Sequence, residues 1–189
     1  MCCGTKRLVE IQCPGDCPWL AGAREHPPAV VVRQHQRDVG ALMEFLRDFN
    51  RRQSQLFLMI STFLVRYEAP VLQPLIDEDI VEGMGALAGT FETASRGVIY
   101  EHRPESMAAE RLASALKPIL SEAGQGAGSA FERDAAVVLR RVADAARGYA
   151  ANDRRAFLDL LSRMITRTAG AGDPEVPAGS DTPERLIVP

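Results

Sequence analysis

The chain has 189 residues, of which 46% are hydrophobic and 25% are charged, and its formal net charge is −3. A chain of this length can bury one hydrophobic core, so the sequence predicts one main domain with small appendages. A weak negative net charge is not typical of proteins that bind nucleic acid or an anionic membrane surface. The composition therefore indicates neither of these partners.

Charged residues are grouped in blocks along the chain. Residues 1–66 carry nine basic and six acidic side chains, residues 67–107 two and eight, and residues 108–168 ten and seven. Residues 169–189 are again acidic, with one basic and four acidic side chains. This pattern favours helices of opposite charge that attract one another or a partner subunit over a dedicated basic binding face.

The composition also bears on the compartment. Arginine, alanine and glycine are abundant, whereas Lys6 and Lys117 are the only lysines, which is typical of GC-rich bacterial genomes. Residues 1–4 show neither the basic nor the apolar region of a secretory signal, so we expect a cytoplasmic protein. The apolar run 56–65 is about half of the roughly 20 residues that span a bilayer. It is predicted to be a buried helix segment.

The longest predicted helix occupies residues 28–69. Apolar residues recur along it at alternating spacings of three and four, the heptad pattern of a helix seam, and prolines bound it at both ends. The sequence predicts a single helix of about 40 residues, on the order of 60 Å long, with a break near residues 50–52 as the alternative. His35 and Gln53 interrupt the seam and would set the register of a coiled-coil homodimer.

Further helices are expected after residue 76. Residues 77–103 and 131–149 repeat the apolar spacing of the first helix, and His102 is expected at the C-terminus of the former. Weaker patterns predict a helix from near Glu105, kinked at Pro118, and another after residue 153. The sequence thus predicts an all-α protein, an antiparallel bundle of about five helices with a long first helix. Three glycines in the second helix, Gly83, Gly85 and Gly89, indicate a close helix crossing.

We divide the chain into an N-terminal Cys-rich clasp (residues 1–27), a helical bundle (28–168) and a C-terminal tail (169–189). The tail is rich in glycine, alanine, proline and acidic residues and is expected to be a flexible tether. Its apolar tip, 186–188, would either pair as a strand with residues 8–11, here or in a partner chain, or fray.

All four cysteines, Cys2, Cys3, Cys13 and Cys17, fall within the first 17 residues. Chance placement explains such clustering poorly, and glycines beside the cysteines allow the tight backbone that directs N–H groups toward thiolates. The sequence predicts that the four thiolates bind one metal ion in a clasp, and structural zinc is the first choice.

Other states of the same cysteines stay open. The run 13–18, CPGDCP, resembles the C-x3-C-P end of bacterial ferredoxin sequences, which keeps an iron–sulfur cluster in view. A redox-active disulfide and reduced thiols are further alternatives. Because adjacent cysteines reach one metal only with a distorted backbone, His26 or His35 is a candidate fourth ligand. A further alternative is that the true start codon lies upstream of Met1 and that additional cysteines precede it.

Four segments carry a resemblance to known sequences: residues 2–7 (CCGTKR), 13–17 (CPGDC), 24–30 (REHPPAV) and 92–102 (ETASRGVIYEH). In these the chain resembles uncharacterised bacterial proteins with an N-terminal CCGTKR…CPxDC segment followed by a helical domain. The resemblance covers most of the chain and implies that the cysteines act together. It implies no function.

Outside the clasp, the best candidate for a ligand or partner site is a polar string comprising Glu92, Arg96, Tyr100 and His102. Glu92 and Arg96 are four residues apart on one helix face, beside the apolar seam. An ordinary i,i+4 ion pair is the alternative explanation for those two, and the helix dipole for His102.

No catalytic constellation is evident. The Glu-x-x-His motifs of di-iron bundles are missing, and three histidines in all leave little room for a hydrolase site. The sequence therefore predicts a non-catalytic, zinc-stabilised interaction or regulatory protein, homodimeric through its long helix. The alternative is a redox or metal sensor that uses the same cysteines. A third hypothesis is an enzyme centred on Glu92, Arg96 and Tyr100.

Overall fold

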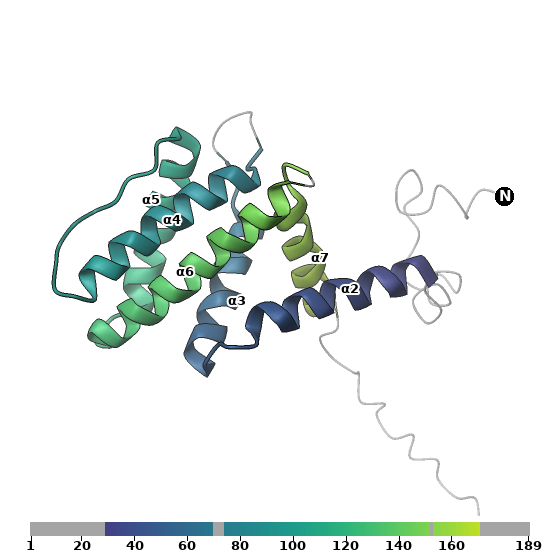
Figure 1. Ribbon diagram of the computed structural model, residues 1–189, viewed down its shortest axis with the longest axis horizontal. Helices are drawn as coiled ribbons and strands as arrows, with labels where there is room; N and C mark the ends of the chain where they lie inside the picture. The colour runs from purple at the N-terminus through teal and green to yellow at the C-terminus, as the bar shows by residue number, and fades with distance from the viewer. Residues whose placement is uncertain (1–28, 70–73, 152, 171–189) are drawn as a thin grey trace, which may run out of the picture. The chain divides into compact units, whose positions relative to one another are not determined.

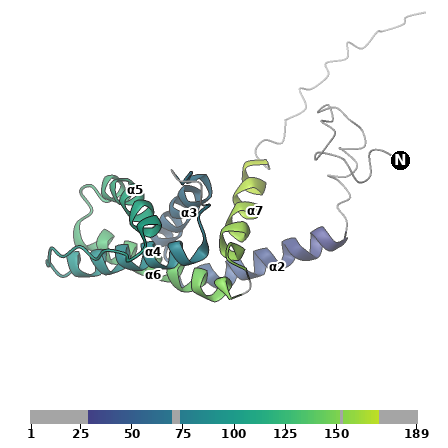
Figure 2. The same ribbon diagram turned by 90° about the horizontal axis from the view of Figure 1, so that it is seen from above.

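Figures 1 and 2 show the computed structural model of the protein, which describes residues 29–69, 74–151 and 153–170. The described residues contain helices and no strands, which confirms the all-α prediction. The helices are α2 (Ala29–Leu46), α3 (Arg51–Arg66), α4 (Asp77–Ala94), α5 (Met107–Ala123), α6 (Gly128–Ala150) and α7 (Ala156–Gly170). The chain divides into two compact units, Met1–Ser54 and Gln55–Pro189, and each is described by itself.

The single long first helix is wrong, and the break near residue 50 is present instead. Asn50 caps the start of α3: its side-chain oxygen accepts the backbone N–H of Gln53 at 2.9 Å. In return, the side-chain oxygen of Gln53 accepts the backbone N–H of Asn50 at 3.1 Å. This reciprocal capping box competes with a continuous helix, because it satisfies N–H groups that a new helix start exposes. Gln53 therefore marks a helix start rather than the register of a dimer seam.

The helix α2 leaves its predicted seam only partly covered. Val32 and Val39 are 38% and 39% exposed, and the buried residue of this helix is Asp38, which accepts a hydrogen bond from the Gln34 side chain at 2.8 Å. Because the seam is interrupted before residue 51, the predicted homodimer loses the long continuous helix on which it was based.

In the second unit, α4 and α6 lie side by side and antiparallel (Figure 1). At one end, the backbone N–H of Asp77, the first residue of α4, donates to the carbonyl of Arg154, just beyond α6, at 2.7 Å. At the other end, the Phe91 ring meets the Phe131 ring at 6.4 Å between centroids. The predicted seams of both helices face the core, because Ile80 and Val138 are both fully buried.

The core of this unit draws on every helix in it. α3 supplies apolar side chains from its second half, and α5, α6 and α7 supply side chains at the spacing of three and four that the sequence predicts. Its buried members include Ile60, Leu64, Met84, Leu112, Leu116, Leu120, Leu139, Val142, Phe157 and Leu161.

The helix α4 ends at Ala94, well before the predicted end near residue 103. Gly97 adopts a left-handed conformation with φ of +79°, and the backbone N–H groups of Gly97 and Val98 donate to Ala94 and Thr93. This is the Schellman termination that glycine favours at a helix end. The chain then returns along α4 as an extended strap, residues 98–106.

Close contact with the strap explains why residue 89 is a glycine, and close contact with α5 explains Gly83. A Cβ at Gly89 would lie 3.0 Å from the His102 ring in the strap, and a Cβ at Gly83 would lie 3.1 Å from the Ala109 carbonyl of α5. Close helix approach is therefore confirmed at Gly83, whereas Gly85 has nothing within 4 Å. His102 is not at a helix C-terminus, so the dipole explanation for it is wrong.

Ion pairs join the acidic and basic blocks of the sequence. Arg140 pairs with Glu92 at 2.9 Å, and Lys117 pairs with Glu101 at 2.6 Å. In both pairs the acid comes from residues 67–107 and the base from residues 108–168, as the charge pattern predicts. No helix in the described part of the chain is long and apolar enough to cross a membrane. The clasp and the apolar tail tip lie outside the described residues.

Candidate functional site

The predicted metal site, Cys2, Cys3, Cys13 and Cys17, lies outside the residues that the structure describes. Zinc, its iron–sulfur alternative and a ligand role for His26 therefore stay predictions. Among residues 29–69, 74–151 and 153–170, no group of three or more His, Cys, Asp or Glu side chains is placed to hold a metal ion.

The second predicted site is partly assembled. Glu92, near the end of α4, and Arg96, two residues beyond it, both line a cleft between α4 and α6. Tyr100 and His102 do not line this cleft. They lie in the strap, where their rings meet edge to face at 4.8 Å, and Tyr100 is 60% exposed. The structure thus brings two of the four candidate residues together with residues of α6.

The expected i,i+4 ion pair between Glu92 and Arg96 is not formed. One carboxylate oxygen of Glu92 instead accepts from Nε and an Nη of Arg140 on α6, at 3.2 and 2.9 Å. The side chain of Arg96 makes no hydrogen bond or ion pair within the described part of the chain. Its guanidinium is left to face the cleft and the solvent.

The cleft has a volume of about 610 Å³ and is rich in arginine. Four arginines line it, Arg96, Arg133, Arg140 and Arg141, with two carboxylates, Glu92 and Asp144, so its lining carries a formal charge of +2. The Asp144 carboxylate is held by Arg147 at 2.6 Å. Ala136 and Val137 provide apolar surface between the charges, and Val137 is 47% exposed. Such a surface suits an anionic group with an apolar neighbour.

Sequence patterns missed the contribution of α6 to this cleft. Arg133, Arg140 and Arg141 lie at i, i+7 and i+8, which places them on one face of a helix. That spacing was a usable signal for a basic stripe. The sequence alone does not show that α4 packs against α6, and this packing brings the basic stripe beside Glu92.

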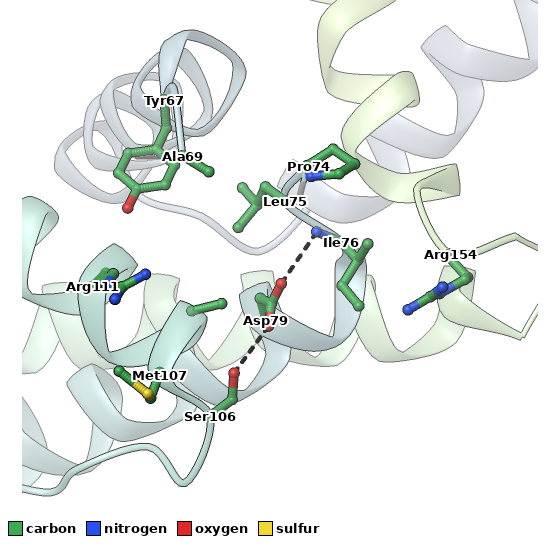
Figure 3. Close-up of a pocket in the computed structure, with 11 residues that line it drawn as sticks. Tyr67, Ala69, Pro74, Leu75, Ile76, Asp79, Ser106, Met107, Arg111 and Arg154 are labelled. Atoms are coloured by element: carbon green, nitrogen blue, oxygen red, sulfur yellow. Dashed lines mark hydrogen bonds between the residues drawn. The ribbon is translucent and has the colours of Figure 1, made fainter. Parts of the chain in front are cut away.

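A second cavity, of about 570 Å³, lies near the first turn of α4 (Figure 3). Asp79 and Ser106 form part of its wall, and their side chains are hydrogen-bonded at 3.1 Å. Tyr67 and Arg111 stand on one side of it, and Arg154 on the other. None of these residues was a candidate in the sequence, because they come from four separate segments.

One acid with a perturbed pKa, Asp77, belongs to neither cavity. Asp77 is fully buried, and its two carboxylate oxygens accept the backbone N–H groups of Phe157 and Leu158 at 2.8 and 3.2 Å. Burial raises the pKa of Asp77, while these two N–H donors act in the opposite direction. Because it caps the first turn of α7, its role is structural.

Comparison of the chain with protein-family models, with curated proteins and with solved structures gives no match in any of the three.

Proposed function

We propose that this protein is a non-catalytic interaction or regulatory protein whose helical body binds an acidic segment of a protein partner in the arginine cleft. Zinc held by Cys2, Cys3, Cys13 and Cys17 would stabilise its N-terminal segment. The observation that carries the proposal is the convergence of four arginines on one cleft at the point where Glu92 and Arg96 mark a candidate site.

The charge of the cleft selects the class of partner. Guanidinium groups bind carboxylates with paired N–H donors, so several of them in one cleft favour a segment with more than one acid. The exposed Val137 between them fits an apolar residue of the same segment. The whole chain is acidic, with a net charge of −3, which disfavours a nucleic-acid backbone as the partner.

The Glu92–Arg140 ion pair gives part of the cleft a defined geometry. The two Arg140 donors on one Glu92 oxygen hold that guanidinium across the α4–α6 interface. Arg96 is the one arginine of the cleft whose side chain makes no hydrogen bond or ion pair within the described part of the chain. It is therefore the best single residue with which to test the cleft.

The test is fluorescence anisotropy with a labelled peptide of about ten residues, mostly glutamate with a central leucine. Arg96→Glu should weaken binding by about five- to tenfold, because it replaces an attraction by a repulsion at an exposed site. Affinity should also fall between about 50 and 200 mM salt.

Arg103→Glu is the matched control. Arg103 is exposed, lies seven residues further along and lines neither cavity. Arg103→Glu changes the net charge of the chain by the same amount as Arg96→Glu. Its effect should stay within about twofold. Equal weakening by the two variants would show that binding follows overall charge and would refute the cleft, as would tighter binding of a labelled oligonucleotide than of the peptide.

The metal part has its own measurement. Elemental analysis of protein purified without air should find about one zinc per chain, and Cys13→Ser should lower both the zinc content and the melting temperature. Iron with a brown colour would instead support the alternative function, a redox or metal sensor, which the CPGDCP run at residues 13–18 favours. No bound metal would refute the clasp.

A further inference from the structure

The cavity near the first turn of α4 is the second site of interest, and it does not rest on the proposed function. Its lining comes from the end of the α3 segment (Tyr67), the start of α4 (Ile76, Asp79), the start of α5 (Arg111) and the link between α6 and α7 (Arg154). A volume of about 570 Å³ lies in the range of about 300–1,000 Å³ that is typical of small-molecule sites.

The wall of this pocket is largely apolar. Leu75, which is 6% exposed, and Ile76 form its inner side, and Pro74 stands beside them (Figure 3). Met107 lies on the other side, near Arg111 and Ser106, and is 67% exposed, which places it at the mouth. An apolar ligand body would gain from contact with these side chains, because both surfaces would leave water.

The carboxylate of Asp79 is hydrogen-bonded within the protein through both of its oxygens. One oxygen of Asp79 accepts the Ser106 hydroxyl at 3.1 Å, and the other accepts the backbone N–H of Ile76 at 3.4 Å. Both bonds join Asp79 to residues that begin helices, so this carboxylate stabilises the wall of the pocket and does not bind a ligand cation.

The two arginines of the pocket, in contrast to Asp79, are available to a ligand. The guanidinium groups of Arg111 and Arg154 make no hydrogen bond or ion pair within the described part of the chain. In Figure 3 the Tyr67 hydroxyl is directed toward the side of the pocket that Arg111 occupies. A carboxylate there would have an O–H donor and a guanidinium fork within one small region.

With two arginines and one committed carboxylate, the lining keeps a formal charge of +1. We propose that this pocket binds a small amphipathic monoanion, a molecule with an apolar body and one carboxylate or similar anionic group. The anionic group lies between Tyr67 and Arg111, and the apolar body lies against Leu75 and Ile76. Arg154 contributes charge from the opposite side.

The test uses the full chain and the fluorescent apolar anion 8-anilinonaphthalene-1-sulfonate as the probe. We expect saturable binding of one probe per chain, and displacement by decanoate but much more weakly by decanol, which has the same chain without the charge. Arg111→Met should raise the dissociation constant of the probe by about tenfold, whereas Arg103→Met, outside the pocket, should leave it within about twofold.

Filling the pocket gives an independent check. Ala108 lines it and is exposed, so the larger side chain of Ala108→Phe occupies part of the cavity without disturbing the core. This variant should lose probe binding by more than about tenfold while keeping the far-UV circular dichroism and melting temperature of the parent chain. Unsaturable probe binding, equal displacement by decanol and decanoate, or full affinity in Ala108→Phe would each overturn the proposal.

Discussion

Removing the Asp77 side chain should destabilise the helical unit more than any other single change to an acidic residue on α4. Its carboxylate is fully buried and accepts the backbone N–H groups of Phe157 and Leu158, while its own N–H donates to the Arg154 carbonyl. One side chain on α4 thus caps α7, which lies about 80 residues further along the chain. Asp77→Ala leaves both of these N–H groups without an acceptor.

The magnitude follows from those two bonds. A buried donor left unsatisfied costs about 1–3 kcal/mol, and part of this is recovered because the variant no longer buries a carboxylate. We therefore expect the free energy of unfolding to fall by about 2–4 kcal/mol. At about 2–4 °C per kcal/mol for a chain of this size, the melting temperature should fall by about 4–16 °C.

Urea and thermal unfolding, followed by circular dichroism at 222 nm, measure this loss. Glu78→Ala is the matched control, because Glu78 is the next residue of the same first turn but is exposed. It removes only an interaction with the helix dipole, worth about 0.3–1 kcal/mol. If Asp77→Ala and Glu78→Ala differ by less than about 0.5 kcal/mol, the capping argument is refuted.

The same carboxyl predicts a pH dependence. Burial raises the pKa of Asp77 above its ordinary 3.8. Between the ordinary pKa of the unfolded state and the raised pKa of the native state, the native state binds the proton more tightly. The free energy of unfolding therefore falls as pH rises through this range. Asp77→Asn does not titrate. The stability of the parent relative to this variant should therefore decline from about pH 4 upward, and an increase in urea titrations over that range would contradict the assignment.

Three further variants test packing and electrostatics elsewhere. Gly85→Ala places its Cβ in open space and should raise the free energy of unfolding by up to about 1 kcal/mol in urea titrations. Gly83→Ala places its Cβ 3.1 Å from the Ala109 carbonyl and should give no gain, so equal gains would contradict the close approach. The hydrogen bond from Lys117 holds the pKa of Glu101 below its ordinary 4.5. Lys117→Met should therefore raise this pKa in an NMR titration, and an unchanged value would disprove the link.

In α4 and α6, helical periodicity predicted which face is buried, but it did not locate the ends of α2 and α4. The seam through Ile80 and Met84 is in the core because spacings of three and four place side chains on one face. Periodicity continues through residues 47–52, however, where the reciprocal bonds of Asn50 and Gln53 begin a new helix. Local hydrogen bonds decided that boundary, and Gly97 decided the end of α4 in the same way.

The candidate sites divide along a similar line. Glu92 and Arg96 were found because they are neighbours on one helix, whereas Tyr100 and His102 were grouped with them only by assuming that the helix continued. Arg140 could not be joined to Glu92 from sequence, since 48 residues separate them and only the antiparallel pairing of α4 and α6 brings them together. The apolar pocket was beyond sequence patterns for the same reason, because its lining comes from four segments.

Both cavities lie along α4, one near Asp79 in its first turn and the other near Glu92 in its last. At 1.5 Å per residue these positions are about 20 Å apart on one continuous helix. Ile80, Met84 and Leu87 between them are buried, so this stretch is held against its neighbours along its length. Communication between two sites needs an element that can adopt two arrangements. A helix packed along its whole length has only a single arrangement. We therefore expect ligands of the two proposed sites to bind independently, so that filling one cavity leaves the affinity of the other unchanged.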